Sequence, residues 1–144
     1  MNEQEVIERV FGAPIDLVWE LWTTAEGIAT WFGPKGFTVK VDAIDLRVGG
    51  SFVYTMTKDA SESEGPSSFS VESTFTVVER PHRLVYESPW RTEMMSTDVT
   101  LSETAEGVKL VLIIGATKPG MTGGAAKGWH SSLDRLAETF ASRA

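Results

Sequence analysis

Two short strings decide how this chain folds, and both lie within its first 50 residues. They are Trp31, Phe32, Gly33 and Pro34, and then Asp45, Leu46, Arg47, Val48, Gly49 and Gly50. Each string joins aromatic or charged side chains to glycines, which bend the backbone at little steric cost. That combination is typical of the mouth of a cavity. Neither string contains an evident catalytic set, so the sequence says more about fold and binding than about chemistry.

The chain before the first string predicts a strand and two short helices. Residues 4–11 form the strand, and Pro14 then stands where the first position of a helix tolerates proline. Thr24 can cap the second helix, which the glycine and proline of the first string end. The inner face of the first helix consists of apolar residues at helical spacing, namely Ile15, Val18, Trp19 and Trp22.

A period of two between residues 37 and 114 predicts an antiparallel sheet. The apolar residues alternate at odd positions before Asp42 and at even positions after Ala43. This change of register by one residue predicts a β-bulge there. Residues 108–114 are apolar on both faces, which indicates a central strand.

Glycines and polar runs predict the connections. Gly49 and Gly50 suit a tight hairpin, because such turns need positive φ angles. The polar run over residues 58–67 predicts an exposed loop. Residues 115–124 are rich in glycine and predict a long connection before the last helix.

The end of the chain predicts a long helix with one apolar face, formed by Trp129, Leu133, Leu136, Ala137 and Phe140. Such a face needs a large apolar surface to cover, and the sheet is the only candidate. We therefore expect an α+β fold in which a curved sheet grips the last helix. The length of 144 residues suits a single domain over 1–144.

Composition limits the function classes. The chain has 42% hydrophobic and 23% charged residues, with a net charge of −7 and 13 scattered basic residues, which argues against nucleic acid as a partner. The absence of cysteine excludes disulfides, and two histidines far apart make a metal site improbable. No run approaches the roughly 20 apolar residues of a membrane span, and the N-terminus is acidic where a signal peptide is basic. We expect a cytoplasmic protein without a cofactor.

Residues along nearly the whole chain resemble the Hsp90-ATPase-activator-like (AHSA1-like) domains of the START-like, or SRPBCC, helix-grip superfamily. The features that carry the resemblance are Ala13, Pro14, Val18, Trp19, Trp22, Thr23, the string from Trp31 to Pro34, Asp45, Arg47, Gly49, Gly50, Gly128, Trp129, Leu133, Arg135 and Leu136. The resemblance implies a strand, two short helices, six more strands and a long C-terminal helix that together enclose a cavity. The superfamily includes lipid carriers, cyclases, hormone receptors and co-chaperones, so fold alone does not give function.

Aromatic residues are the candidates for lining this cavity. Five tryptophans are many for this length, and Trp19 and Trp22 suit the core by their spacing. For Trp31, Phe32 and Trp90, beside glycine or proline at element ends, core packing and cavity lining are equally good interpretations. The candidate lining residues are Trp31, Phe32, Tyr54, Phe75, Tyr86, Trp90, Met95, Gly128, Trp129 and Leu133.

Gly128 stands out within the last helix, because glycine in a helix costs about 1 kcal/mol relative to alanine. Close approach of a strand or of a ligand would offset that cost. The alternative is that the helix begins only after Gly128.

Asp45 and Arg47 are two residues apart and can pair on one face of a strand. A general-acid or oxyanion role is conceivable, but a surface pair that supports the hairpin is favoured. We therefore assign Asp45, Arg47, Gly49 and Gly50 a structural role and name no catalytic residue. The sequence has neither a Gly-x-Ser-x-Gly elbow nor a phosphate-binding loop.

Three functions remain open. The first is binding of a small hydrophobic or aromatic molecule between the sheet and the last helix. The second is an enzyme of the cyclase, dehydratase or hydrolase type that uses the same cavity. The third, which rests on the resemblance, is an interaction domain for a chaperone of the Hsp90 type. A homodimer is also left open.

Overall fold

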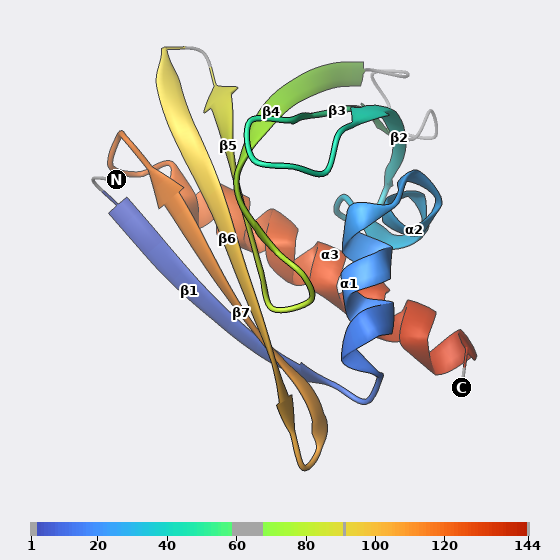
Figure 1. Ribbon diagram of the computed structural model, residues 1–144. Helices are drawn as coiled ribbons and strands as arrows, with labels where there is room; N and C mark the ends of the chain where they lie inside the picture. Colours follow the sequence, from blue (N-terminus) through green and yellow to red (C-terminus); the bar gives the residue numbers. More distant parts are fainter. Residues whose placement is uncertain (1–2, 59–67, 91, 144) are drawn as a thin grey trace.

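The computed structural model describes residues 3–58, 68–90 and 92–143 (Figure 1). Its elements follow in the order β1 (Glu3–Phe11), α1 (Ile15–Thr23), α2 (Ala25–Trp31), β2 (Phe37–Ile44), β3 (Ser51–Lys58), β4 (Ser68–Glu79), β5 (Arg83–Trp90), β6 (Glu93–Thr104), β7 (Gly107–Ala116) and α3 (Thr122–Arg143). The loop expected over residues 58–67 lies outside the described residues apart from Lys58, which ends β3.

The seven strands form one antiparallel sheet in the order β1-β7-β6-β5-β4-β3-β2. The sheet curves strongly, and α3 runs across one of its faces while α1 and α2 lie at the other end of the molecule from the β1 N-terminus (Figure 1). The predicted α+β helix-grip fold is therefore confirmed. Among the described strands, β1 is an edge strand that pairs only with β7, the last strand of the chain. In this pairing Glu3 lies opposite Ala116.

β7 pairs with β1 on one side and β6 on the other, as its two apolar faces predict. Val108, Leu110, Leu112 and Ile114 are at most 1% exposed and face the core, while Val111 and Ile113 are half-buried on the outer face. The predicted β-bulge is also confirmed, since the pairing of β2 with β3 shifts between Val41 and Ala43. A second shift, between Phe75 and Val77, was not predicted.

The β2–β3 connection is longer than the tight hairpin that the two glycines predicted. It spans residues 45–50 and is closed by backbone hydrogen bonds, including the Gly50 N–H to the Arg47 carbonyl at 2.8 Å. Gly49 has a φ of 84°, and a side chain at Gly50 would collide with the Asp45 carbonyl. The connection therefore requires both glycines, but it is a six-residue turn and not the tight hairpin that was predicted.

α3 begins at Thr122, earlier than the glycine-rich sequence indicated. The predicted connection over residues 115–124 is thus too long, and Gly128 lies well inside the helix. A carboxylate from β1 explains the early start: Glu3 accepts hydrogen bonds from the Gly120 N–H at 2.8 Å, the Thr122 N–H at 3.0 Å and the Thr122 hydroxyl. These contacts satisfy groups that a helix N-terminus leaves free.

The core lies between the sheet and the three helices. Trp19 and Trp22 are each 2% exposed, as their spacing predicted. The inner face of α3 consists of Leu133, Leu136 and Phe140, whereas Ala137 is exposed, contrary to the prediction. A one-residue step along a helix turns by about 100°, so Ala137 cannot share the face of Leu136 fully.

Candidate functional site

A cavity of about 470 Å³ opens between the sheet and the first half of α3. Strands β3 to β7 supply one wall, and residues at the start of α3 supply the other. The α3 wall consists of Gly124, Ala125 and Trp129. Its volume lies within the range of roughly 300–1,000 Å³ that is usual for small-molecule sites.

The structure brings five of the ten candidate lining residues to this cavity, namely Tyr54, Tyr86, Trp90, Met95 and Trp129. Phe32 and Gly128 border a smaller recess of about 140 Å³, which shares Tyr54 and Trp129 with the cavity. These seven residues come from strands, a helix end and α3, and they meet only because the sheet curves around the helix.

The other three candidates lie elsewhere. Trp31, Phe75 and Leu133 are at most 1% exposed and do not border the cavity or the recess. The Trp31 indole N–H donates to the Leu21 carbonyl at 2.7 Å, which fixes that ring between α1 and α2. Their assignment to the lining is corrected: they form the packed core behind the walls.

Three residues at the cavity mouth were missed from the sequence: Phe37, Phe69 and Met121. The Phe69 ring lies 6.5 Å from the Phe37 ring and 6.2 Å from the Trp90 ring, measured between centroids. Phe69 is 41% and Trp90 is 44% exposed. The sequence offered one signal for the two missed phenylalanines. Phe37 and Phe69 lie at or next to the beginning of a strand, beside polar or turn-forming neighbours.

Among the residues that the structure describes, no charged side chain borders the cavity. The polar side-chain groups of the described lining residues are the hydroxyls of Tyr54, Tyr86, Ser88, Ser96 and Thr97 and the indole N–H of Trp129. The Ser88 hydroxyl is bonded to the Ser73 hydroxyl at 2.7 Å, so it is already partnered. The described part of the lining is therefore mainly apolar, with a few neutral polar groups.

The two tyrosines are the deepest polar groups. Burial raises the pKa of Tyr54, and the neighbouring Tyr86 raises it further. Burial also raises the pKa of Tyr86, while Trp22 and Thr97 nearby oppose part of that rise. Both phenols consequently remain neutral at physiological pH and can donate a hydrogen bond.

The Tyr86 hydroxyl makes no hydrogen bond of normal geometry to the residues that the structure describes. The same is true of the Trp22 indole N–H, which lies near that hydroxyl.

The first sequence string forms one side of the recess because α3 holds it. Arg135 Nη1 donates to the carbonyls of Gly33 at 2.8 Å, Phe37 at 3.3 Å and Phe32 at 3.4 Å. The Lys35 N–H donates to the Ser131 hydroxyl at 2.9 Å. The turn after α2 is thus fastened to the helix that forms the opposite wall.

Asp45 and Arg47 form the predicted pair, with Nε and Oδ2 at 2.7 Å, in the β2–β3 connection. Their side chains are 52% and 70% exposed, and neither borders the cavity. A surface pair of this kind is worth at most about 1 kcal/mol. The pair therefore does not supply an acid or base to the cavity.

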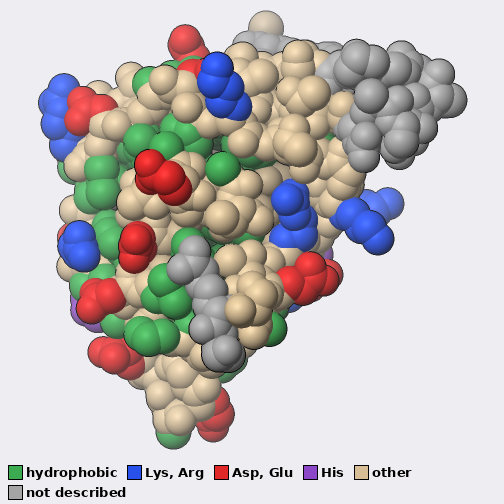
Figure 2. All heavy atoms as spheres, turned by 90° about the vertical axis from the view of Figure 1, so that its right-hand side faces the viewer, with side chains coloured by type: hydrophobic (Ala, Val, Ile, Leu, Met, Phe, Trp, Pro, Cys, Tyr) green, Lys and Arg blue, Asp and Glu red, His purple; other side chains and the backbone are tan. Residues whose placement is uncertain are grey.

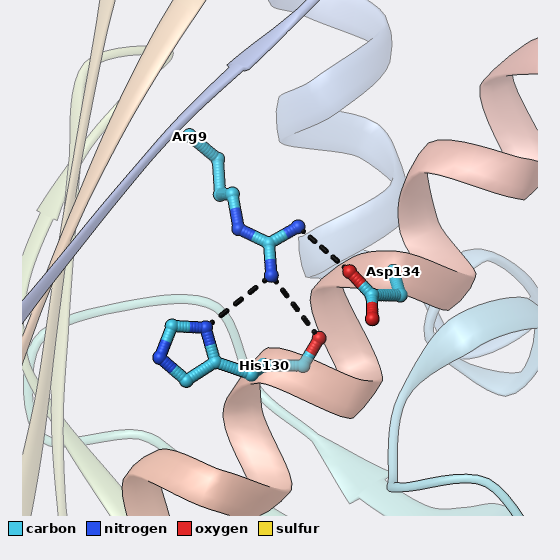
Figure 3. Close-up of polar contacts among 3 residues, drawn as sticks. All are labelled: Arg9, His130 and Asp134. Atoms are coloured by element: carbon cyan, nitrogen blue, oxygen red, sulfur yellow. Dashed lines mark hydrogen bonds and ion pairs between the residues drawn. The ribbon is translucent and has the colours of Figure 1, made fainter.

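A second charged cluster lies between β1 and the middle of α3 (Figure 3). The Arg9 guanidinium contacts the Asp134 carboxylate at 2.9 Å, and the carbonyl and Nδ1 of His130 at 3.3 Å each. Figure 3 shows the arginine reaching from the strand to the helix, where it spans both residues. Its role is to hold α3 over the sheet edge.

The outer surface is mixed in charge. On the face that carries α1, α2 and the end of α3, basic and acidic side chains are interspersed and do not gather into one basic patch (Figure 2). In the part of the chain that the structure describes, no helix is both long enough and apolar enough to cross a membrane.

Comparison with known proteins gives a family and a fold. Residues 12–141 match the family model described as Activator of Hsp90 ATPase homolog 1-like protein. No match was found among curated proteins.

Solved structures of similar chains come from several bacteria. A protein from Chromobacterium violaceum is 24% identical, with a TM-score of 0.85, and the match covers 96% of this chain and 97% of that one. An AHSA1-like protein from Aeromonas hydrophila is 25% identical, with a TM-score of 0.79 and coverage of 94% and 90%. An AHSA1 protein from Silicibacter pomeroyi is 20% identical, with a TM-score of 0.80 and coverage of 99% and 100%.

Proposed function

The chain belongs to the family of Activator of Hsp90 ATPase homolog 1-like proteins, and on that basis we propose that it binds a small hydrophobic or aromatic molecule between the sheet and α3. The observation that carries the proposal is the cavity of about 470 Å³, whose described lining residues carry no charge. Clefts of roughly 300–1,000 Å³ with mainly apolar walls and a few polar groups are the usual sites of small molecules. A space of this size with apolar walls is therefore suited to a guest.

The lining supports an aromatic guest in particular. Phe37, Phe69 and Trp90 place three rings around the mouth, and Trp129 lies in the α3 wall. When a ligand covers half-exposed rings of this kind, apolar surface is removed from water. This burial contributes roughly 25 cal/mol of favourable binding free energy per Å². Ring edges and faces also favour an aromatic partner.

Binding is tested by thermal unfolding and by tryptophan fluorescence. The probes are uncharged aromatic and aliphatic molecules, including 2-ethylnaphthalene. A ligand at 100 times its Kd stabilises the folded state by about 2.7 kcal/mol, which raises the Tm by several degrees. Trp90 and Trp129 border the cavity and report on occupation by a change in emission.

A matched pair of variants locates the site. Ala125→Phe places a ring into the cavity wall, and Ala137→Phe places the same ring on the exposed face of the same helix. We expect Ala125→Phe to weaken binding by more than about tenfold, because the ring takes up the space that the ligand needs. Ala137→Phe leaves binding unchanged. Equal affinities of the two variants would place the ligand elsewhere, and no stabilisation by any probe would refute the proposal.

The family description favours a second candidate function, which is stimulation of an Hsp90-type ATPase. The measurement is the ATPase rate of a purified Hsp90-type chaperone with and without this protein, together with a pull-down. If the cavity is not part of that interaction, Ala125→Phe stimulates as well as the unaltered protein. Absence of both binding and stimulation dismisses this candidate.

We further propose that residues 1–144 act as one domain in the cytoplasm. The homodimer stays a prediction, which light scattering after size-exclusion chromatography would test.

A further inference from the structure

The two edge strands of the sheet, β1 and β2, differ in how open they are to another strand. An edge strand presents unpaired N–H and C=O groups, and proteins commonly hinder pairing there with bulges, lysines or prolines. β2 has such features, because its pairing with β3 shifts between Val41 and Ala43 and its Lys40 is exposed. β1 pairs with β7 over nine consecutive residues without a shift, and its sequence has no lysine, proline or glycine. β1 is therefore the edge that is suited to pairing.

The outer edge of β1 is also free and partly apolar. No described element pairs with that edge, and β1 runs along the outside of the molecule (Figure 1). Val6 and Val10 of β1 are 60% and 55% exposed on the outer face of the sheet. β-Branched residues of this kind favour a paired strand, where neighbouring side chains cover them.

The charged side chains of β1 point to a specific partner. Glu3 is bonded to the start of α3, and Glu8 contacts Lys109 of β7 with Oε1 and Nζ 3.2 Å apart. The Arg9 guanidinium contacts α3 through Nη1 and Nη2, which leaves its Nε–H available. Glu5 is the one charged residue of β1 that has no ion pair or hydrogen bond to the described residues.

A second copy of the same strand supplies the missing cation. Two antiparallel copies of β1, related by a two-fold axis through Ile7, place Glu5 of each copy directly opposite Arg9 of the other. Directly opposite residues have Cβ atoms about 4.5–5.5 Å apart, within reach of an ion pair. Moving the axis by one residue in either direction places Glu5 opposite an apolar residue instead. Charge complementarity therefore selects one register.

The same register covers the exposed valines. Val6 lies diagonally across from both Val6 and Val10 of the second copy, on the outer face of the joined sheet. Apolar surface that is exposed in one chain is thus removed from water when two chains pair.

We propose that two copies of this chain associate through the free edge of β1, antiparallel and with the two-fold axis at Ile7, so that the two sheets become continuous. Glu5 of each copy then pairs with Arg9 of the other. The inference is independent of the ligand proposed above, because none of the residues 3–11 borders the cavity.

The first measurement is the mass of the full chain in solution, by light scattering or sedimentation, over concentrations up to about 1 mM, where even an association with a Kd of that order is visible. The average mass should rise from 15.7 kDa towards twice that value. A mass that stays at one chain over the whole range would overturn the proposal.

Glu5→Lys tests the charge pairing. We expect it to raise the Kd of the dimer by at least about tenfold, because two symmetric attractions become repulsions. Glu72→Lys is the matched control: it makes the same change of charge at an exposed position of β4, away from the β1 edge, and should leave the Kd unchanged. At low concentration Glu5→Lys should melt with the unaltered protein, since Glu5 has no described partner in its own chain. Equal dimerisation of the two variants would contradict the proposed interface.

Cysteine pairs test the register, because the natural sequence has no cysteine. The variant Gln4→Cys with Val10→Cys places thiols opposite each other across the axis, at a spacing that a disulfide can bridge. It should form a covalent dimer on mild oxidation, seen on a non-reducing gel. The control, Gln4→Cys with Val6→Cys, has as many thiols on the same face but none opposite another, and should cross-link at least about tenfold more slowly. Equal rates would place the contact between the copies elsewhere and overturn the proposal, even if the protein is a dimer.

Discussion

Gly128 shows how one residue can be explained only with its surroundings. It lies inside α3, where glycine lowers helix stability, and a Cβ atom built on it meets nothing within 4 Å. The close approach of a strand, one of the two explanations considered from the sequence, is therefore wrong. What faces Gly128 is the recess shared with Phe32 and Trp129.

Gly128→Ala is expected to raise the free energy of unfolding by about 1 kcal/mol, because alanine is the better helix former and its methyl group has room. Gly27→Ala is the contrasting control in α2, where a Cβ atom would lie 2.7 Å from the Leu21 Cα. That change should destabilise the protein. Urea denaturation of both variants measures the difference. A loss of stability in Gly128→Ala would mean that the recess closes against the helix in solution.

At the scale of elements, α3 is fastened by side chains from distant parts of the chain. Glu3 of β1 holds its N-terminus, Arg9 of the same strand holds its middle, and its own Arg135 grips the turn after α2. The connection before α3 is fixed as well, since Thr117 donates to Glu93 Oε2 at 2.6 Å. The cavity wall that α3 provides is thus positioned by polar contacts as well as by core packing.

Glu3 makes this fastening dependent on pH. The hydrogen bond from the Thr122 hydroxyl, and then those from the backbone N–H groups of Gly120 and Thr122, lower the pKa of the Glu3 carboxyl in the folded state. Because the folded pKa is the lower one, the stabilisation is complete above the ordinary carboxyl pKa. It is lost as the pH falls through the folded value.

Glu3→Gln is therefore expected to be less stable than the unaltered protein at pH 7, and the difference should shrink as the pH is lowered below about 4. Thermal unfolding across this pH range measures it. Glu5→Gln, on the same strand, is the control, because the described contacts of the α3 N-terminus involve Glu3 alone. A difference that stays constant with pH would contradict the assigned role of the ionised carboxylate.

At the scale of the whole molecule, local patterns predicted the elements but not the contacts between distant ones. The slip of parity around Asp42 was visible in the sequence, because alternation is a property of neighbouring residues. The early start of α3 was not, since it depends on Glu3, 119 residues away from Thr122. The same applies to the site: Phe75 and Tyr86 are equally good aromatic candidates in the sequence, and only the curvature of the sheet decides which of them borders the cavity.

The Trp22–Trp129 pair gives the molecule an optical reporter of its own. The two rings are stacked with centroids 5.6 Å apart and planes at 19°, and only Trp129 borders the cavity. Indoles held this closely couple their electronic transitions, so their fixed relative orientation contributes to the near-ultraviolet circular dichroism. A guest that touches Trp129 changes that coupling while Trp22 stays enclosed, and occupation can be followed without a dye, a label or an added chromophore.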